Sequence, residues 1–241
     1  MSRVHMPLPY RPHLEYEYEL AALGVTAVAG IDEVGRGTLA GPVVAGTAIL
    51  PGRVSGDWWQ LVRDSKQMTP GQRQHAYVNL SEACVAVSTG ACDAFEIDRI
   101  GIVAATRLAM ARAIESLDVQ PGHLLIDALT LPEIPIPQTA IIKGDAISLS
   151  IAAASIIAKV TRDRLMETVF EDSFPGYGFA ENKGYGTAAH FLALETLGPS
   201  PAHRFSFAPI RDTLSPRRAV SDPADWPQGY VELSDAREAT A

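Results

Sequence analysis

The sequence of 241 residues has few cysteines, no long hydrophobic run and no excess of basic charge. No apolar stretch reaches transmembrane length, and residues 1–20 lack the apolar core of a secretion signal, so we expect a cytoplasmic protein without membrane contact. The two cysteines, Cys84 and Cys92, lie in or beside a predicted strand. Two thiols alone do not make a zinc site, and we expect both to be buried in a reducing compartment.

The net charge of −8 argues against a protein that coats nucleic acid nonspecifically, because such proteins usually carry a basic excess. A nucleic-acid enzyme is not excluded, since carboxylates in an active site add negative charge that bound cations cancel. The apolar content of 47% and charged content of 20% are ordinary for a globular protein. The length predicts one large domain, alone or with a smaller appendage.

Hydrophobic periodicity predicts an α/β protein with helices on the faces of a sheet. Strands are predicted at 26–34, 41–50, 84–91, 123–128 and 139–145. Helices are predicted at 13–24, 69–83, 96–117, 148–170 and 187–198. Thr69 and Thr187 are expected to cap the second and the last of these helices. A glycine-rich turn joins the first two strands as a hairpin-like pair, and pure strand–helix alternation is absent, so the pattern favours a mixed sheet.

Three aspartates share one setting, because each follows the apolar residues of a predicted strand. They are Asp32, with Glu33 beside it, Asp127 and Asp145. In open α/β sheets, ligands bind beyond strand ends. Two carboxylates about 4 Å apart repel by about 4 kcal/mol at an effective dielectric of 20, so a cluster needs protonation or divalent cations. Oxygen donors without His or Cys fit Mg²⁺ or Mn²⁺.

The alternative is a set of unrelated caps and salt bridges, which explains one such aspartate well and four acids poorly. Adjacent residues on a regular strand point to opposite faces. Asp32 and Glu33 therefore share a site only if the strand ends or twists between them, which Gly35 would permit.

Two glycine-flanked loops are candidate substrate contacts. The loop GRGTLAG, residues 35–41, would let backbone N–H groups approach an oxyanion or a sugar, although a tight structural turn explains it equally well. It lacks the Gly-Lys-Ser/Thr ending of a P-loop and the spacing of a dinucleotide fingerprint. Tyr185 lies between two glycines, where its ring can stack on a sugar or base; an exposed ring on a turn is the alternative.

Basic residues elsewhere are candidate phosphate contacts. Lys66 lies in the stretch RDSKQ, where a solvated loop is the alternative. His203 and Arg204 lie in AHRFSF, and a structural role is the usual one for a single histidine near a helix end.

Six blocks of the sequence resemble the successive motifs of the ribonuclease HII family, in the family's order and over about residues 28–210. The blocks are GIDEVGRGTLAGPVVAG, DSKQMTPGQR, LLIDALTLP, KGDAISLSIAAASIIAKVTRDRLM, NKGYGT and HRFSF. The resemblance implies a ribonuclease H-like fold: a five-stranded mixed sheet flanked by helices, with a small helical C-terminal part. Composition predicts a polar, Pro-containing lead-in at 1–25 and a loosely ordered acidic tail at 215–241, so the expected catalytic domain covers 26–214. Val34 and Thr38 depart from the alanine and proline that are common in the first block.

The resemblance also implies a function: an endoribonuclease that cleaves the RNA strand of RNA/DNA hybrids and cuts 5′ of single ribonucleotides in duplex DNA. The implied ligands of two Mn²⁺ or Mg²⁺ ions are Asp32, Glu33, Asp127 and Asp145. The expected substrate contacts are Gly35, Arg36, Gly37, Lys66, Tyr185 and Arg204. A monomer is expected, and contact with a replication clamp is left open. The alternatives are a nucleotide- or anion-binding protein without hydrolytic activity and a type 1-like ribonuclease H that needs several consecutive ribonucleotides.

Overall fold

A five-stranded mixed sheet forms the centre of the computed structural model, which describes residues 11–55 and 58–212. The strands are β1 (Val28–Val34), β2 (Val43–Ile49), β3 (Ala86–Cys92), β4 (His123–Asp127) and β5 (Gln138–Ile141). They lie in the order β3-β2-β1-β4-β5. β2 is antiparallel to both β1 and β3, whereas β4 is parallel to both β1 and β5. The predicted mixed sheet of five strands is therefore confirmed.

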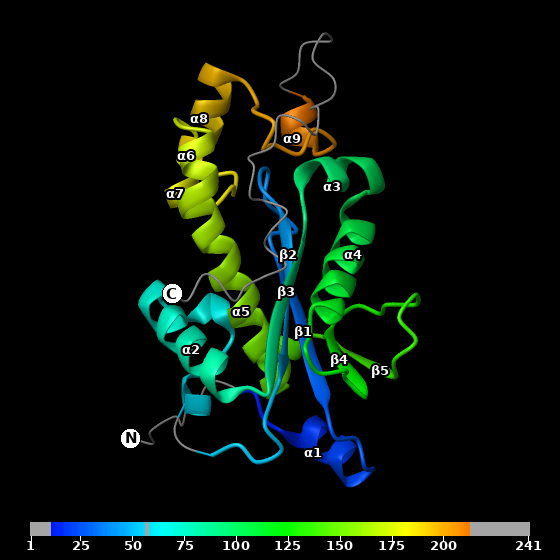
Figure 1. The fold of residues 1–241 in the computed structure, drawn as a ribbon. Coiled ribbons are helices and arrows are strands. Elements are labelled where there is room, and N and C mark those ends of the chain that lie inside the picture. The colour runs from blue at the N-terminus through cyan, green and yellow to red at the C-terminus, as the bar shows by residue number, and fades with distance from the viewer. Residues whose placement is uncertain (1–10, 56–57, 213–241) are drawn as a thin grey trace, which may run out of the picture.

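Helices surround this sheet (Figure 1). The α-helices are α1 (Glu15–Ala22), α2 (Pro70–Ala83), α3 (Ala94–Ile100), α4 (Ile102–Glu115), α5 (Leu149–Leu165), α6 (Glu171–Ser173), α7 (Phe179–Asn182), α8 (Ala188–Leu197) and α9 (Ala208–Arg211). Shorter turns are the 3-10 segments η1 (Trp58–Leu61), η2 (Ser65–Gln67) and η3 (Gly144–Ala146), and a π-helical segment, η4 (Met166–Phe170), extends α5. The predicted caps Thr69 and Thr187 are confirmed, because each side chain accepts from a backbone N–H of the first turn. The single helix predicted at 96–117 is wrong: Gly101, at φ +80°, divides it into α3 and α4.

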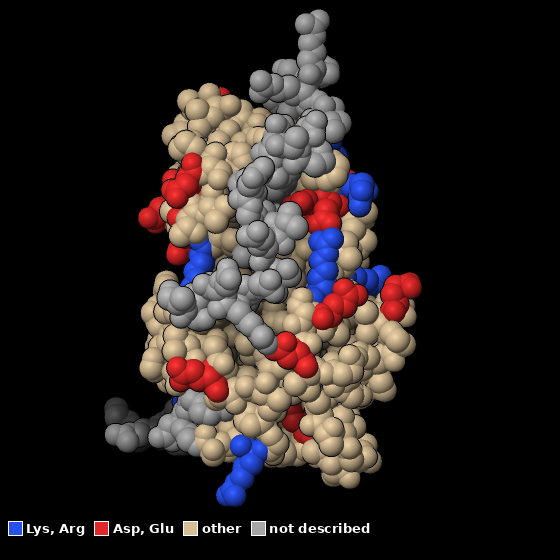
Figure 2. Space-filling view, viewed as in Figure 1, with Lys and Arg blue, Asp and Glu red and all other residues tan. Residues whose placement is uncertain are grey.

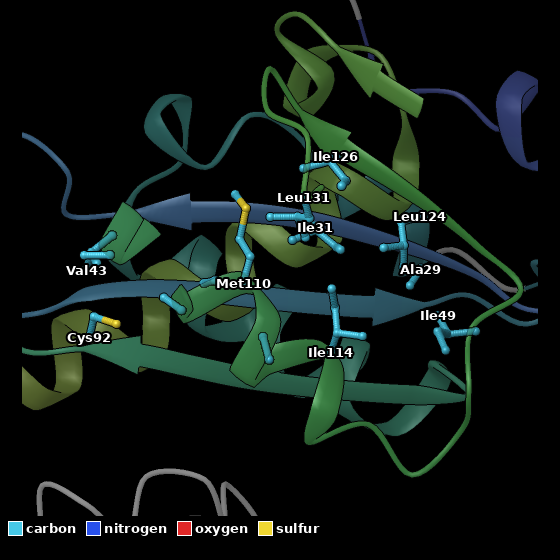
Figure 3. Close-up of a cluster of buried hydrophobic side chains, with 14 of the residues drawn as sticks. Ala29, Ile31, Val43, Ile49, Cys92, Met110, Ile114, Leu124, Ile126 and Leu131 are labelled. Atoms are coloured by element: carbon cyan, nitrogen blue, oxygen red, sulfur yellow. The ribbon is translucent and has the colours of Figure 1, made fainter. Parts of the chain in front are cut away.

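The helices α5 and α4 cover opposite faces of the sheet. α5 lies across β1 and β2, and α4 lies across β2 and β3 (Figure 1). Small residues let α5 approach closely: a Cβ built on Gly30 would lie 2.0 Å from the Ser150 carbonyl carbon. The face that α4 covers contains the main core cluster, in which Ile31, Met110 and Ile126 are fully buried (Figure 3).

The segment before β1 packs against the sheet. α1 places Tyr16 and Leu20 on a small cluster with Val28 and Leu125. Glu17, also on α1, accepts from the Ser150 backbone N–H at 3.0 Å and so caps the start of α5. The predicted tail at 215–241 lies outside the described residues. Within the described ranges, none of the helices has the length and apolar character needed to cross a bilayer.

The cysteines are in apolar surroundings. Cys92 is buried at the end of β3, as expected, whereas Cys84 is half-buried after α2. Burial raises the pKa of each thiol to about 12, so both remain protonated and unreactive at neutral pH.

Candidate active site

The sheet brings the predicted acids to one end of its strands. Asp32 lies within β1 and Asp127 is the last residue of β4. These strands are parallel neighbours in which Ile31 pairs with Ile126, so the two aspartates follow at adjacent positions. Asp127 in turn pairs with Ile141 of β5, and η3, which contains Asp145, begins three residues later. Three separated stretches of sequence therefore deliver carboxylates to the same end of the sheet.

Asp32 and Glu33 both lie at this end of the sheet, although β1 continues through both positions. Both pair in register with β2, opposite Gly46 and Ala45, so β1 does not end between them, and of the two expected routes only a twist of the strand is left. Asp32 is only 3% exposed, and its Oδ1 accepts a hydrogen bond from the Glu33 backbone N–H at 2.7 Å. Glu33 instead accepts a hydrogen bond from Arg36, in the loop that follows β1. Asp127 interacts electrostatically with both acids, which identifies it as the common neighbour.

The carboxylates make ionisation costly for one another. The pKa of Asp32 is raised well above its ordinary value by burial and then by the charges of Glu33 and Asp127. The pKa of Glu33 is also raised, mainly by burial and despite the lowering effect of Arg36. Burial raises the pKa of Asp127, and the charge of Asp145 adds to it. The four acids are thus coupled electrostatically through Asp127.

Two cations border the acids. Lys66 Nζ lies 3.4 Å from Asp145 Oδ2, and Arg36 Nη1 donates to Glu33 Oε1 at 3.2 Å. Burial lowers the pKa of Lys66, but Asp145 and Asp32 more than offset this effect, so its pKa lies above its ordinary value. The Lys66 side chain is 79% exposed, so its ammonium group can also face a bound phosphate. Both cations were predicted as substrate contacts, and both lie at the rim of the acidic site.

The donor set fits a hard divalent cation. Oε2 of Glu33 is buried and has no hydrogen-bond partner among the described residues, which is costly for a carboxylate oxygen unless a cation completes the site. All four candidate ligands are carboxylates, the type that Mg²⁺ and Mn²⁺ prefer. Within the described ranges no three acidic, histidine or cysteine side chains already converge on one metal position. Two of the carboxylates are turned towards Lys66 and Arg36, so binding would require them to turn inward.

The glycine-rich loop, residues 35–41, leaves β1 beside these acids. Gly35 has φ +88°, and a Cβ there would lie 2.3 Å from Nε of Arg162, so this position needs glycine. Gly37 is exposed, and a Cβ there would meet nothing within 4 Å. The loop thus has a tightly packed inner side and an open outer side at Gly37, where a ligand can approach its backbone.

Arg162 of α5 supports this loop from inside and was missed by the sequence reasoning. Its guanidinium is fully buried and donates to the carbonyls of Pro42 and Ala40 at 2.8 and 3.1 Å. It also donates to the Lys183 carbonyl at 2.9 Å, in the loop before Tyr185. One side chain therefore fixes both candidate substrate loops. The available signal was an arginine in a helix segment whose other buried residues are small or apolar.

Arg204 does not lie where a phosphate contact requires it. Its side chain is fully buried and donates to the carbonyls of Gly35, Arg36 and Gly41 at 2.6, 2.8 and 2.9 Å. A buried guanidinium satisfied by loop carbonyls cannot reach solvent-exposed phosphate, so the expectation of substrate contact is corrected: Arg204 holds the glycine-rich loop in place. His203 is likewise buried, which agrees with the structural alternative for this residue.

Tyr185 lies on a second loop next to the first. Its ring is 41% exposed, with Nζ of Lys159 5.8 Å from the ring centroid. Leu39 N–H donates to the Gly184 carbonyl at 2.8 Å, which joins the two loops directly. A Cβ on Gly184 would lie 2.4 Å from the Ala40 carbonyl oxygen, so this contact depends on glycine. The structure therefore places the tyrosine ring on the solvent side of the glycine-rich loop.

The arrangement is a carboxylate cluster beside a backbone-lined loop and an exposed aromatic ring. On the face drawn in Figure 2, acidic and basic side chains are interspersed, and the described residues visible there form no continuous basic stripe.

Comparison with known proteins gives a consistent result. The family model described as Ribonuclease HII matches residues 29–210. Ribonuclease HII of Dehalococcoides mccartyi is 50% identical over 206 residues, which cover 86% of this chain and 97% of the relative. The crystal structure of the ribonuclease H2 from Pyrococcus horikoshii OT3 has a TM-score of 0.65 at 28% identity, covering 78% of this chain and 96% of that one.

A structure of the PCNA:RNase HII complex from Archaeoglobus fulgidus shares the fold, with a TM-score of 0.63 at 23% identity, over 83% of this chain and 100% of that chain. Residues 29–210, which the family model matches, contain all four acids and both loops. The likeness favours hydrolysis over the alternative of a nucleotide-binding protein without activity. The chain thus belongs to the ribonuclease HII family, and it is a type 2 ribonuclease H, an endoribonuclease that acts on RNA/DNA hybrids.

Proposed function

We propose that this enzyme also cuts duplex DNA 5′ of a single embedded ribonucleotide, and that Asp32, Glu33, Asp127 and Asp145 hold two divalent cations for the reaction. The observation that carries the proposal is the four-acid site itself. Three of its members have raised pKa values, and one buried oxygen, Oε2 of Glu33, lacks a partner within the described part of the chain. Mn²⁺ or Mg²⁺ would offset this repulsion.

When bound, such ions lower the pKa of the attacking water and stabilise the departing 3′-oxygen. The chain itself supplies orientation. The Glu33 N–H donates to Asp32 Oδ1 at 2.7 Å, the Gly144 N–H donates to Asp127 Oδ1 at 2.7 Å, and these two bonds orient the two carboxylates. Lys66, at the rim, balances the charge of the phosphate and of Asp145. Positioning and charge neutralisation dominate phosphoryl transfer, so no side chain needs to act as a general base.

The glycine-rich loop is the proposed sensor of the ribonucleotide. Only the 2′-hydroxyl distinguishes RNA from DNA along the backbone. Gly37 is open to solvent, while the Gly35 and Arg36 carbonyls are held from behind by Arg204. A sugar can therefore approach the backbone of residues 35–37 without meeting a side chain at Gly37, and the rigid loop can hydrogen-bond its 2′-hydroxyl.

Tyr185 is the proposed sensor of the junction between RNA and DNA. Its exposed ring would stack on the next deoxyribose, where an added 2′-hydroxyl would crowd it. Tyr185→Ala should therefore lower cleavage of single-ribonucleotide duplexes more than cleavage of long hybrids. Tyr18→Ala, which removes an exposed ring on α1, is the matched control. Equal losses on both substrates would remove Tyr185 from junction sensing.

A gel assay tests the proposed function. The substrate is an end-labelled DNA duplex with one ribonucleotide, incubated with the enzyme with and without Mg²⁺ or Mn²⁺, next to an all-DNA duplex and a long RNA/DNA hybrid. We expect one cut on the 5′ side of the ribonucleotide, no cleavage in EDTA, and restored cleavage after either ion is added. Cleavage of the hybrid alone would support the type 1-like alternative, and cleavage without metal would refute the cation scheme.

A further inference from the structure

Two histidines form a fully buried pair behind the tyrosine loop. His190 lies on α8 and His203 lies in the segment that follows it, and neither side chain is exposed. Their Nε2 atoms are 3.0 Å apart. Nδ1 of His190 lies 2.9 Å from the Tyr185 carbonyl oxygen. The hydrolytic reaction proposed above uses neither residue.

The hydrogen bonds fix one tautomer for each ring. A carbonyl oxygen only accepts, so Nδ1 of His190 must carry the proton that it donates to Tyr185. A neutral His190 then has a bare Nε2, which accepts from a protonated Nε2 of His203. The bare Nδ1 of His203 accepts from the Ser200 N–H at 3.0 Å and faces the Ser200 hydroxyl at 2.9 Å. The reverse orientation, with Nδ1 of His203 donating to the Ser200 carbonyl at 3.3 Å, would leave two bare nitrogens facing each other.

The surroundings keep both rings neutral. Phe179 packs edge-on against His190, with ring centroids 5.6 Å apart, and Tyr177 packs against His203 at 4.9 Å. Burial lowers the pKa of His190, and burial together with His190 lowers the pKa of His203 to about 3. A continuous chain of directed hydrogen bonds therefore persists at neutral pH.

This chain joins the two substrate loops. At one end, His190 holds the Tyr185 carbonyl. At the other, the His203 backbone forms a β-bridge with Ala40 of the glycine-rich loop, and the flanking Arg204 N–H donates to the Leu39 carbonyl at 2.9 Å. The histidine pair is therefore a further link between the Tyr185 backbone and the glycine-rich loop, in addition to the Leu39–Gly184 hydrogen bond and Arg162.

We infer that His190 and His203 are positioning residues for substrate selection, which hold Tyr185 at the distance from the glycine-rich loop that one ribonucleotide followed by a deoxyribose requires. This inference rests on the junction role proposed for Tyr185. The pair does not touch the substrate. Its loss should change the preference between substrates more than it changes the rate on long hybrids.

Two substitutions of His190 each break one link of the chain. In His190→Asn the amide nitrogen takes the place of Nδ1 and keeps the donor to Tyr185, but the bond to His203 is lost. In His190→Gln the amide takes the place of Nε2 and keeps a partner for His203, but the donor to Tyr185 is lost. The measured quantity is the ratio of kcat/KM on a single-ribonucleotide duplex to kcat/KM on a long hybrid. We expect each variant to lower this ratio about five-fold, the factor that loss of one typical hydrogen bond gives. A defect of packing alone would lower both kcat/KM values together and leave the ratio unchanged.

Controls distinguish the possible failures. His123→Gln alters a histidine that bonds Thr139 near the start of β4 and should leave the ratio unchanged. If Tyr185→Ala lowers the ratio but His190→Gln does not, the positioning role is overturned and the junction role stands. If Tyr185→Ala itself leaves the ratio unchanged, the junction role fails, and the positioning role fails with it.

The wild-type enzyme offers a second test that needs no variant to fold. Nitrogen-15 NMR of its histidine side chains at pH 7 should show His190 protonated at Nδ1 and His203 protonated at Nε2, both neutral. The same tautomer in both rings, or a charged ring in either, would overturn the inference.

Discussion

Replacing Gly46 by alanine is expected to push α5 away from the sheet and so weaken both the fold and the active site. A Cβ at this position would lie 2.4 Å from the Ala154 carbonyl oxygen and 2.8 Å from the Ala158 nitrogen. Both atoms belong to the backbone of α5, so neither can turn aside. Because Cβ atoms essentially never come within 3.0 Å of a neighbour, the helix must retreat by about 0.6 Å or more in a close-packed interior.

The cost follows from the packing. Overfilling a well-packed core costs about 1–3 kcal/mol, and we expect about 3 kcal/mol here because α5 packs along both β1 and β2. For a domain of this size, that loss lowers Tm by about 6–12 °C. The same displacement moves Arg162 away from the two loops. We therefore expect kcat to fall even well below Tm.

Thermal melts, urea unfolding and hybrid cleavage at 25 °C check this expectation. Gly71→Ala is the matched control, since a Cβ there would meet nothing within 4 Å and the residue lies in the first turn of α2. This control should stabilise the protein by about 0.5–1 kcal/mol. A Gly46→Ala variant that melts within about 1 °C of wild type would refute the packing described for α5.

Three further outcomes are expected. Ala128→Gly should stabilise the fold by about 0.5–1 kcal/mol in urea unfolding, because Ala128 is exposed and strained at φ +53°, and a loss of stability would contradict this. Between pH 6.5 and 5 the unfolded chain gains a proton at His203 that the folded chain does not, so this residue should lower the free energy of unfolding by about 2 kcal/mol as the pH falls. His203→Gln should lose less stability over the same pH range. Identical pH dependence of the free energy of unfolding in the two proteins would refute the lowered pKa. Arg204→Lys should lower kcat without changing the salt dependence of KM, since Arg204 holds loop carbonyls. A weaker dependence of KM on salt in the variant would instead indicate that Arg204 contacts a phosphate.

The sequence was sufficient where one local signal decides the structure. Apolar runs located all five strands, and Asp127 and Asp145 could be assigned to one edge because each follows such a run. Thr69 followed by Pro70 identified the start of α2. Gly101 was not recognised as a helix break, since an isolated glycine within a helical pattern is often tolerated.

The remaining features arise from tertiary contacts. Arg162 and Arg204 are charged residues that are usually exposed, and their burial depends on carbonyls supplied by loops more than 100 residues away in sequence. The pairing of His190 with His203 depends on how the chain turns after α8, which no local pattern encodes. Strand alternation argued against a shared site for Asp32 and Glu33, and only tertiary structure shows that Asp127, at the end of the neighbouring strand, raises the pKa of both.

Binding of Mn²⁺, followed by electron paramagnetic resonance, tests most directly whether the four acids form a cation site. The titration compares wild type with Asp127→Asn and with Glu133→Gln, a control that alters an exposed carboxylate, each with an RNA/DNA hybrid that resists cleavage. We predict two bound ions per wild-type and control chain, and the loss of at least one in Asp127→Asn. Equal number and affinity of bound ions in all three proteins would contradict the assignment of these carboxylates as ligands.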